Sequence, residues 1–235
     1  DIANTVTANL SRATVYPANS VLQDGTGDWY KVRVNSTGVF KIDRNLLVSM
    51  GVDLSSFNPQ HLNVYGNATP MLSIFNSENR PNDLIKNSIY AFGENDGVFN
   101  DNDYYLFYAQ GPTKWEYNPG YGFRHQVNLY DDYTYYYINI NPSEPAQRIA
   151  NEAEITNPVD FTVNTFNDYT YYEQELENQT LGGKNWYGEK FDYILSYDFL
   201  FGFPDLVLSD SVKINIAYLA YGGSSNSYFE TRINS

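Results

Sequence analysis

Apolar and polar residues alternate along much of this chain, which is the pattern of β-strands with one buried face. The first clear run is 30–34, in which three apolar residues are separated by two basic ones. A turn at 35–38 separates this run from a second one at 39–42. The two runs are therefore predicted to pair as a β-hairpin.

A short helix is predicted directly after this pair of strands. Asp43 can cap the first turn with its carboxylate, and Leu46 and Leu47 begin an apolar stripe that continues at Met50. Gly51 follows at the position where many helices end in a left-handed residue. The pattern predicts little other helix.

Further strands are predicted throughout the chain. Segment 166–177 fits both the helical and the strand period, and the strand is preferred. In 191–203 every odd position is aromatic or Leu, which predicts a long strand, or two strands joined by a bend, with one apolar face. The remaining predicted strands are 62–65, 89–92, 104–109, 133–140, 161–165 and 212–218. This succession predicts an all-β fold of antiparallel sheets packed as β-sandwich-type domains, with very little helix.

The domain organisation follows from where these patterns stop. Residues 1–27 are predicted to be an N-terminal extension and 28–145 a first β domain. A polar, proline-containing stretch makes 146–160 the predicted linker. A second β domain is predicted over 161–235, and the strand-like pattern near its end predicts that it is truncated there.

Composition excludes several classes of function. The 235 residues carry 14 Lys and Arg against 28 Asp and Glu, a net charge of −14, which argues against nucleic acid as a partner. There is no Cys, so neither a disulfide nor thiolate chemistry is available in this chain. No apolar run is long enough to predict a transmembrane helix. The 23 Tyr and 14 Phe suit half-buried strand positions and provide ample material for a core.

Candidate catalytic groups are sparse. His61 and His125 lie in unrelated contexts without metal-ligand spacing, so ordinary structural or surface roles are favoured for both. No nucleophile elbow or phosphate-binding loop is present. Glu189 with Asp192 is the better of the carboxylate pairs considered for glycosidase chemistry, but spacing alone does not set the geometry that such chemistry needs.

An acidic, Asn-rich loop at 93–103 is the candidate metal site. Asp96, Asn100, Asp101 and Asp103 could supply the oxygen ligands that Ca²⁺ prefers. The loop does not match an EF-hand, because Gly97 directly follows Asp96 and the closing Glu is absent. An Asx-rich turn without metal explains the same residues, and both interpretations stay open.

Four aromatic residues near Gly-rich turns are candidates for a binding surface. Trp115 and Tyr117 follow a Gly-Pro pair, and Trp186 and Tyr187 follow two glycines. They could stack against sugars or a partner, or they could plug the ends of a sandwich.

A set of short blocks follows in order along the chain. The blocks are DWYKV at 28–32, GVFKID at 38–43, VYGN at 64–67, DL at 83–84, GENDGVF at 93–99, DYYLFYAQGP at 103–112, FRH at 123–125, NLY at 128–130, YYY at 135–137 and GGKNWYGEKF at 182–191. Taken in this order, they resemble the opening of the C-terminal signal peptidases, or sortases, of the type IX secretion system, which are gingipain-like cysteine peptidases of family C25. The resemblance covers about 28–235, and it departs where Ala68 and Thr69 stand in place of glycines and where Lys184-Asn185 replaces Gly-Arg.

This resemblance implies a secreted, outer-membrane-associated surface protein. Its Cys–His peptidase domain would lie downstream, would remove C-terminal signals from secreted cargo and would help attach the cargo to lipopolysaccharide. The implied partners are that peptidase domain, an outer-membrane β-barrel shuttle protein and other members of the attachment complex. No catalytic residue and no cofactor is implied within this chain, which is predicted to be a non-catalytic scaffold or docking region. A carbohydrate-binding β-sandwich module and a Ca²⁺-stabilised adhesive domain are the alternatives.

Overall fold

The computed structural model describes residues 3–4, 19–23, 26–73, 75–156, 158–179, 181–183, 185–220 and 227–234. The chain divides into two compact units, Asp1–Asn157 and Pro158–Ser235. The named strands all lie in the first unit, together with one α-helix and two single-turn 3-10 helices, η1 (Pro59–His61) and η2 (Glu94–Asp96). The all-β prediction is confirmed.

The larger sheet of the first unit has five antiparallel strands. Its centre is β10 (Thr134–Ile140), which pairs along its whole length with β2 (Asp28–Val34) and over four residues with β4 (Leu62–Tyr65). The short strands β1 (Ala3–Asn4) and β5 (Lys86–Asn87) form the two edges. The predicted strands at 62–65 and 133–140 are thereby confirmed.

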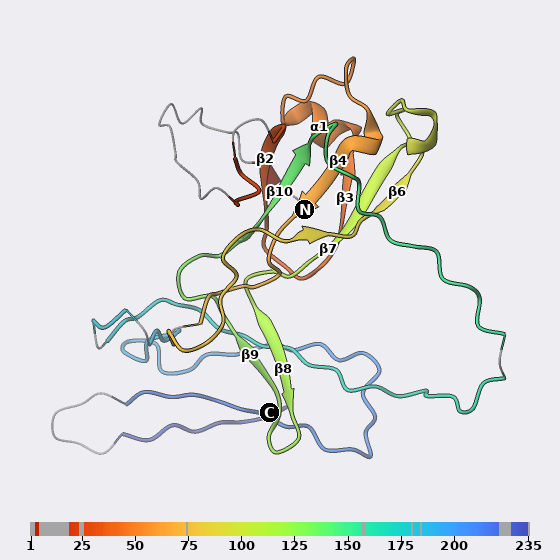
Figure 1. Cartoon of the computed structure of the whole chain (residues 1–235). Helices are drawn as coiled ribbons and strands as arrows, with labels where there is room; N and C mark the ends of the chain where they lie inside the picture. The colour runs from red at the N-terminus through yellow and green to blue at the C-terminus, as the bar shows by residue number, and fades with distance from the viewer. Residues whose placement is uncertain are drawn as a thin grey trace. The chain divides into compact units, whose positions relative to one another are not determined.

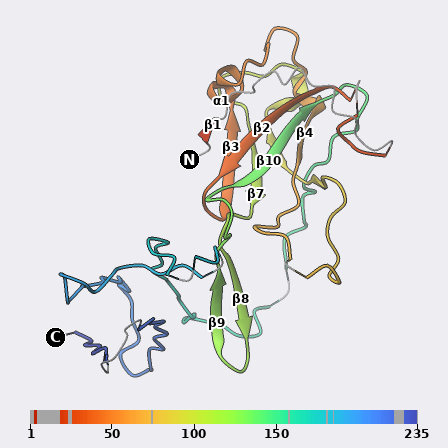
Figure 2. The same ribbon diagram turned by 90° about the vertical axis from the view of Figure 1, so that its left-hand side faces the viewer.

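The smaller sheet has three antiparallel strands. β7 (Tyr104–Ala109) lies in the middle, between β3 (Gly38–Asp43) and β6 (Tyr90–Phe92). Figures 1 and 2 show the two sheets stacked as the layers of a sandwich, with the helix at one end. The predicted strands at 39–42, 89–92 and 104–109 are confirmed within a residue or two.

The core lies between these layers and is built by alternate residues of each strand. Tyr136 and Ile138 of β10 are fully buried and face a layer that contains Phe107, whose ring centroid is 5.5 Å from that of Tyr136. The other buried apolar residues are Val32, Val34, Phe40, Ile42, Leu47, Val52, Phe57, Leu62, Val64, Ile89, Phe99, Tyr105 and Ala109. Burial of this set is the main stabilising contribution that the described contacts provide.

The predicted hairpin between 30–34 and 39–42 is wrong. β2 and β3 do not pair with each other but belong to different sheets. Both strands bury one apolar face, and in the sandwich these faces meet across the core instead of lying side by side. The chain passes from one sheet to the other in the turn between β2 and β3. Thr37 anchors this turn, because its hydroxyl accepts hydrogen bonds from Gln110 Nε2 at 2.7 Å and from Gly111 N at 3.0 Å.

The predicted helix is confirmed as α1 (Arg44–Ser49). The Asp43 carboxylate accepts a hydrogen bond from Leu46 N at 3.0 Å, which satisfies one of the free amides of the first turn. Gly51 adopts a φ of 84°, where a residue with a Cβ would be strained. Leu47 is fully buried and packs the helix against the core.

Two further strands form a separate ribbon. β8 (Lys114–Asn118) and β9 (Gly122–Gln126) pair antiparallel and extend away from the sandwich in Figure 2. Their cross-strand pairs place Trp115 opposite His125 and Tyr117 opposite Phe123.

The segment that leaves the sandwich is attached firmly to it. Arg148 forms a parallel bridge with Ile89, and Ile149 N donates to Ile89 O at 2.9 Å. The Arg148 guanidinium makes a bidentate ion pair with Glu94, in which Nε lies 2.9 Å from Oε1 and Nη2 lies 2.7 Å from Oε2. Its Nη1 also donates to Leu62 O at 2.9 Å. We call this set of contacts the exit clasp.

The second unit departs from the sequence prediction. Among its described residues the structure forms no β-strand at 161–165, 166–177, 191–203 or 212–218, and one isolated bridge joins Glu177 and Tyr187. Alternation specifies an extended backbone with two faces, but a strand also needs a ladder of hydrogen bonds to a neighbour. In 166–177 the bridge between Glu177 and Tyr187 is too short to make such a ladder. The apolar side chains of these segments are largely exposed.

Among the described residues, no helical segment has both the length and the hydropathy that a bilayer crossing requires.

Candidate binding surface

The outer face of the three-stranded sheet is unusually apolar. Alternation along β7 sends Tyr105, Phe107 and Ala109 into the core and leaves the other three residues outward. We call the outward residues of the sheet the aromatic face. They are Val39, Lys41 and Asp43 on β3, Tyr104, Leu106 and Tyr108 on β7, and Tyr90 and Phe92 on β6.

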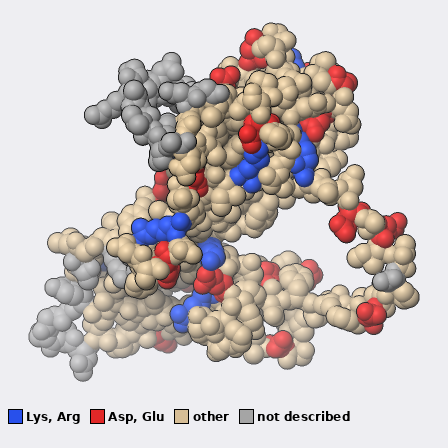
Figure 3. Space-filling model, viewed as in Figure 1, with Lys and Arg blue, Asp and Glu red and all other residues tan. Residues whose placement is uncertain are grey.

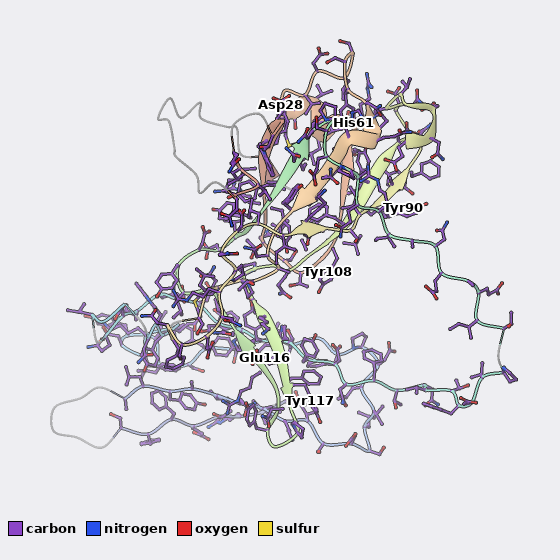
Figure 4. The ribbon with its side chains drawn as sticks, viewed as in Figure 1. Asp28, His61, Tyr90, Tyr108, Glu116 and Tyr117 are labelled. Atoms are coloured by element: carbon purple, nitrogen blue, oxygen red, sulfur yellow. The ribbon has the colours of Figure 1, made fainter. Side chains whose placement is uncertain are left out.

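Much of this face is accessible to solvent. Tyr108 is 58% exposed and Phe92 47%, and Figure 4 marks Tyr90 and Tyr108 on the same sheet. An antiparallel sheet with one buried face normally carries polar residues on the other. A contiguous group of exposed aromatic residues on a regular sheet therefore indicates a contact surface.

Tyr104, the first residue of the middle strand, contacts side chains from both neighbouring strands. The ring of Phe92 stacks on it with centroids 5.1 Å apart and planes inclined by 15°, and the ring of Tyr90 lies at 6.4 Å. From β3, on the opposite side of β7 from β6, the Lys41 ammonium lies 5.0 Å from the centroid of the Tyr104 ring. Three strands thus contribute to one cluster on a rigid framework.

A polar hollow adjoins this cluster at the start of the helix. It has a volume of about 420 Å³ and is lined by Lys41, Asp43, Arg44, Asn45 and Asp101. Lys41 and Asp43 belong both to the hollow and to the aromatic face, so the two features are continuous. The lining offers hydrogen-bond donors and acceptors together.

The charged groups of the hollow are held by local contacts. Arg44 Nε lies 3.1 Å from Asp101 Oδ1, and Arg44 Nη1 donates to Phe99 O at 3.0 Å. Lys41 Nζ is 4.0 Å from Asp43 Oδ2. Figure 3 shows basic and acidic side chains interspersed on the visible face of the molecule. The hollow therefore presents paired charges and no net excess of either sign.

The predicted calcium residues lie together in one loop, where their carboxylates are used by the loop itself. Asp96 accepts from Val98 N at 3.0 Å and from Asn100 Nδ2 at 3.1 Å, and Asp103 accepts from Asn100 N at 2.7 Å. Asp101 pairs with Arg44. Within the described part of the chain, no group of three or more His, Cys, Asp or Glu side chains is placed to hold a metal ion. These bonds support the Asx-rich turn, and calcium stays a prediction.

Gly93 explains how this loop closes. Its φ is 88°, and a Cβ at this position would lie 1.8 Å from Asp103 Oδ1. Asp103 itself is buried. The loop thus needs Gly93 for its backbone conformation and for the space that the buried carboxylate occupies.

The two histidines occupy separate structural settings. His61 ends η1, and its carbonyl accepts from Asn141 N at 3.2 Å. His125 lies on β9, with its ring 5.3 Å from that of Trp115. These positions are consistent with ordinary structural roles for both residues.

The four predicted binding-surface aromatics divide between the two units. Trp115 and Tyr117 lie on β8, where Tyr117 is 62% exposed and stands beside Glu116 in Figure 4. Trp186 donates from Nε1 to Gly183 O at 3.3 Å, and Tyr187 makes the backbone bridge to Glu177. Their predicted role in binding stays a prediction.

The carboxylates considered for glycosidase chemistry are engaged in local contacts. Glu189 accepts a hydrogen bond from the Tyr172 hydroxyl, and Asp192 lies 3.5 Å from Lys190 Nζ.

Sequence reasoning missed both the aromatic face and the exit clasp. A signal for the first was present: the segment YYLFYA at 104–109 has no polar residue on either face. Such a strand is either buried on both sides or exposes an apolar face, and periodicity does not distinguish the two. No comparable signal links Glu94 to Arg148, which are 54 residues apart.

Comparison with solved structures finds a distant similarity. No protein-family model matches the chain, and no curated protein matches it. The crystal structure of dimeric latent PorU from Porphyromonas gingivalis is similar over 52% of this chain, with 24% identity and a TM-score of 0.34. This chain spans about a tenth of that protein, as the match covers 10% of it.

Proposed function

We propose that this chain is a non-catalytic scaffold region of a sortase-like surface protein of the type IX secretion system. It would position a downstream cysteine-peptidase domain that removes C-terminal signals from secreted cargo and helps attach the cargo to lipopolysaccharide. The ordered sequence blocks that resemble this family motivate the proposal. The chain contributes no Cys of its own to such chemistry.

The exit clasp is the observation that carries the scaffold role. If the segment after β10 were joined to the sandwich by the covalent chain alone, its direction would not be fixed. Instead Arg148 is tied to Glu94 and to the Leu62 carbonyl, and Gln147 N donates to Asn63 Oδ1 at 3.0 Å. The side chains of Arg148 and Glu94 are only 19% and 17% exposed, so solvent screens their attraction weakly. The point from which the following chain departs is therefore fixed to a rigid sandwich.

The first test is the intact native protein. Its mass and downstream sequence should give a chain several hundred residues longer, with a gingipain-like domain containing a Cys and a His after Ser235. A native chain that ends near Ser235, or one that continues into an unrelated domain, would overturn the sortase assignment.

The second test addresses the scaffold role in the full-length protein. Arg148→Met should slow the removal of the C-terminal signal from a cargo protein, while Arg232→Met, which breaks an exposed pair with Glu230, should leave the rate unchanged. The folded state of both variants is monitored by circular dichroism. Equal rates for wild type and a folded Arg148→Met protein would contradict the scaffold role.

A further inference from the structure

We propose that the aromatic face and the adjoining hollow form a binding site for a neutral oligosaccharide. The inference concerns this chain alone and does not depend on the sortase assignment. A pyranose ring has an apolar face of C–H groups and a rim of hydroxyl groups. The surface offers a partner for each of these features, side by side.

The apolar half of the site is formed by the exposed rings of Tyr90, Phe92 and Tyr108. Tyr104 is less exposed and supports them, because Phe92 stacks on it at 5.1 Å. Aromatic side chains bury a large area at a small entropic cost, and Tyr keeps a hydroxyl for the wet edge. Because these residues lie on hydrogen-bonded strands, the platform is formed before the ligand arrives.

The polar half is the hollow next to Lys41. Sugar hydroxyl groups both donate and accept hydrogen bonds, so they need donors and acceptors within a short distance of each other. Asn45 offers both from one exposed side chain, and Asp101 and Arg44 offer one kind each. The volume of about 420 Å³ lies within the range of small-ligand sites.

The pairing of charges favours a neutral glycan over an anionic one. Arg44 is held by Asp101, and Lys41 lies near Asp43. An anionic sugar would have to compete with these carboxylates for the cations, in a chain whose net charge is −14.

The aromatic face has the dimensions of one or two sugar rings. Three strands spaced by roughly 4.8 Å give a width of about 10 Å, and the outward residues of β7 extend over about 14 Å.

The test is a titration of the whole chain with neutral tetrasaccharides. Cellotetraose, mannotetraose, maltotetraose and chitotetraose are each added up to roughly 10 mM, and binding is followed by amide chemical shifts and by calorimetry. At least one probe should shift the resonances of β3, β6 and β7. Absence of binding by all four probes would overturn the proposal.

Matched variants locate the site. Phe92→Ala and Asn45→Ala should each weaken binding by about tenfold, while Tyr108→Phe, which keeps the ring, should retain most of the affinity. Tyr130→Ala is the control, because Tyr130 is a 79% exposed tyrosine outside the aromatic face. If Tyr130→Ala weakens binding as much as Phe92→Ala, or if the aromatic-face variants change only binding to a protein partner, the proposal is wrong.

Discussion

The two units of the chain carry the same alternating pattern but differ in what it produces. In β10, alternation buries Tyr136 and Ile138 completely. In 191–203 an equally regular alternation leaves Tyr193 95% and Leu195 76% exposed. The apolar content of the two segments is similar, so composition does not explain the difference.

What differs is the presence of neighbours. β10 is hydrogen-bonded to β2 on one side and to β4 on the other, and a second sheet covers its inner face. The extended segments of the second unit make ring contacts, such as the one between Tyr218 and Phe229 with centroids 4.6 Å apart. Their described residues form no sheet. Alternation selects an extended backbone, whereas a buried face requires pairing and an opposing layer.

The largest expected difference between the units is in amide hydrogen exchange. Amides of β10 and of the strands beside it should exchange only through global opening, whereas those of 191–203 should exchange almost freely. The rates should differ by roughly a thousandfold or more. Mass spectrometry of exchanged peptides measures this directly. Equal protection in both regions would mean that 191–203 also forms a paired sheet.

A matched pair of core and surface phenylalanines should respond very differently to truncation. Phe107 is 1% exposed and Phe166 is 85% exposed. Phe107→Ala should lower the free energy of unfolding by about 3–5 kcal/mol, because it leaves a cavity. Phe166→Ala should change that free energy by no more than about 0.5 kcal/mol. Urea denaturation gives both values, and similar losses for the two variants would contradict the contrast.

Two arginine pairs extend the comparison to electrostatics. Arg148→Met leaves Glu94 partly buried without its partner and should cost about 3 kcal/mol of the free energy of unfolding. Arg232→Met breaks the exposed pair with Glu230 and should cost less than about 1 kcal/mol. Glu94→Gln combined with Arg148→Met should recover part of the loss, since no lone charge then remains. A cost for Arg148→Met below that for Arg232→Met would remove the exit clasp as a stabilising feature.

The smallest expected effect is a loss of sandwich stability at alkaline pH. Burial, with a smaller contribution from the negative charge of Glu144, raises the pKa of Tyr65 to about 12, against an ordinary value of 10.0. Because the folded pKa lies above the unfolded one, this contribution is complete below pH 10 and is lost as the pH rises towards 12. Burial also raises the pKa of Tyr105 and Tyr136.

Thermal unfolding measured at steps between pH 9 and 11.5 tests this expectation. The melting temperature should fall beyond pH 10, and tyrosinate absorbance should show a late-ionising fraction. Tyr65→Phe should flatten part of the decline. A melting temperature that rises beyond pH 10 would contradict the predicted sign.

The sequence by itself determined the local features of this protein. The helix at Arg44–Ser49 follows from a capping Asp and a closing Gly. β2 and β3 follow from period-two alternation, and β7 and β10 from short runs rich in aromatic residues. The inward face of β10 was also predictable, because the alternation assigns Tyr136, Ile138 and Ile140 to the same side.

Only the tertiary structure decided which elements meet. It placed β2 and β3 in different sheets, joined Glu94 to Arg148 across 54 residues, and left the outer side of an all-apolar strand accessible to solvent. A single strand does not encode its neighbours, because backbone hydrogen bonds are chemically alike along every strand. Pairing is chosen by how side chains from distant parts of the chain fill one core, and periodicity alone does not record that choice.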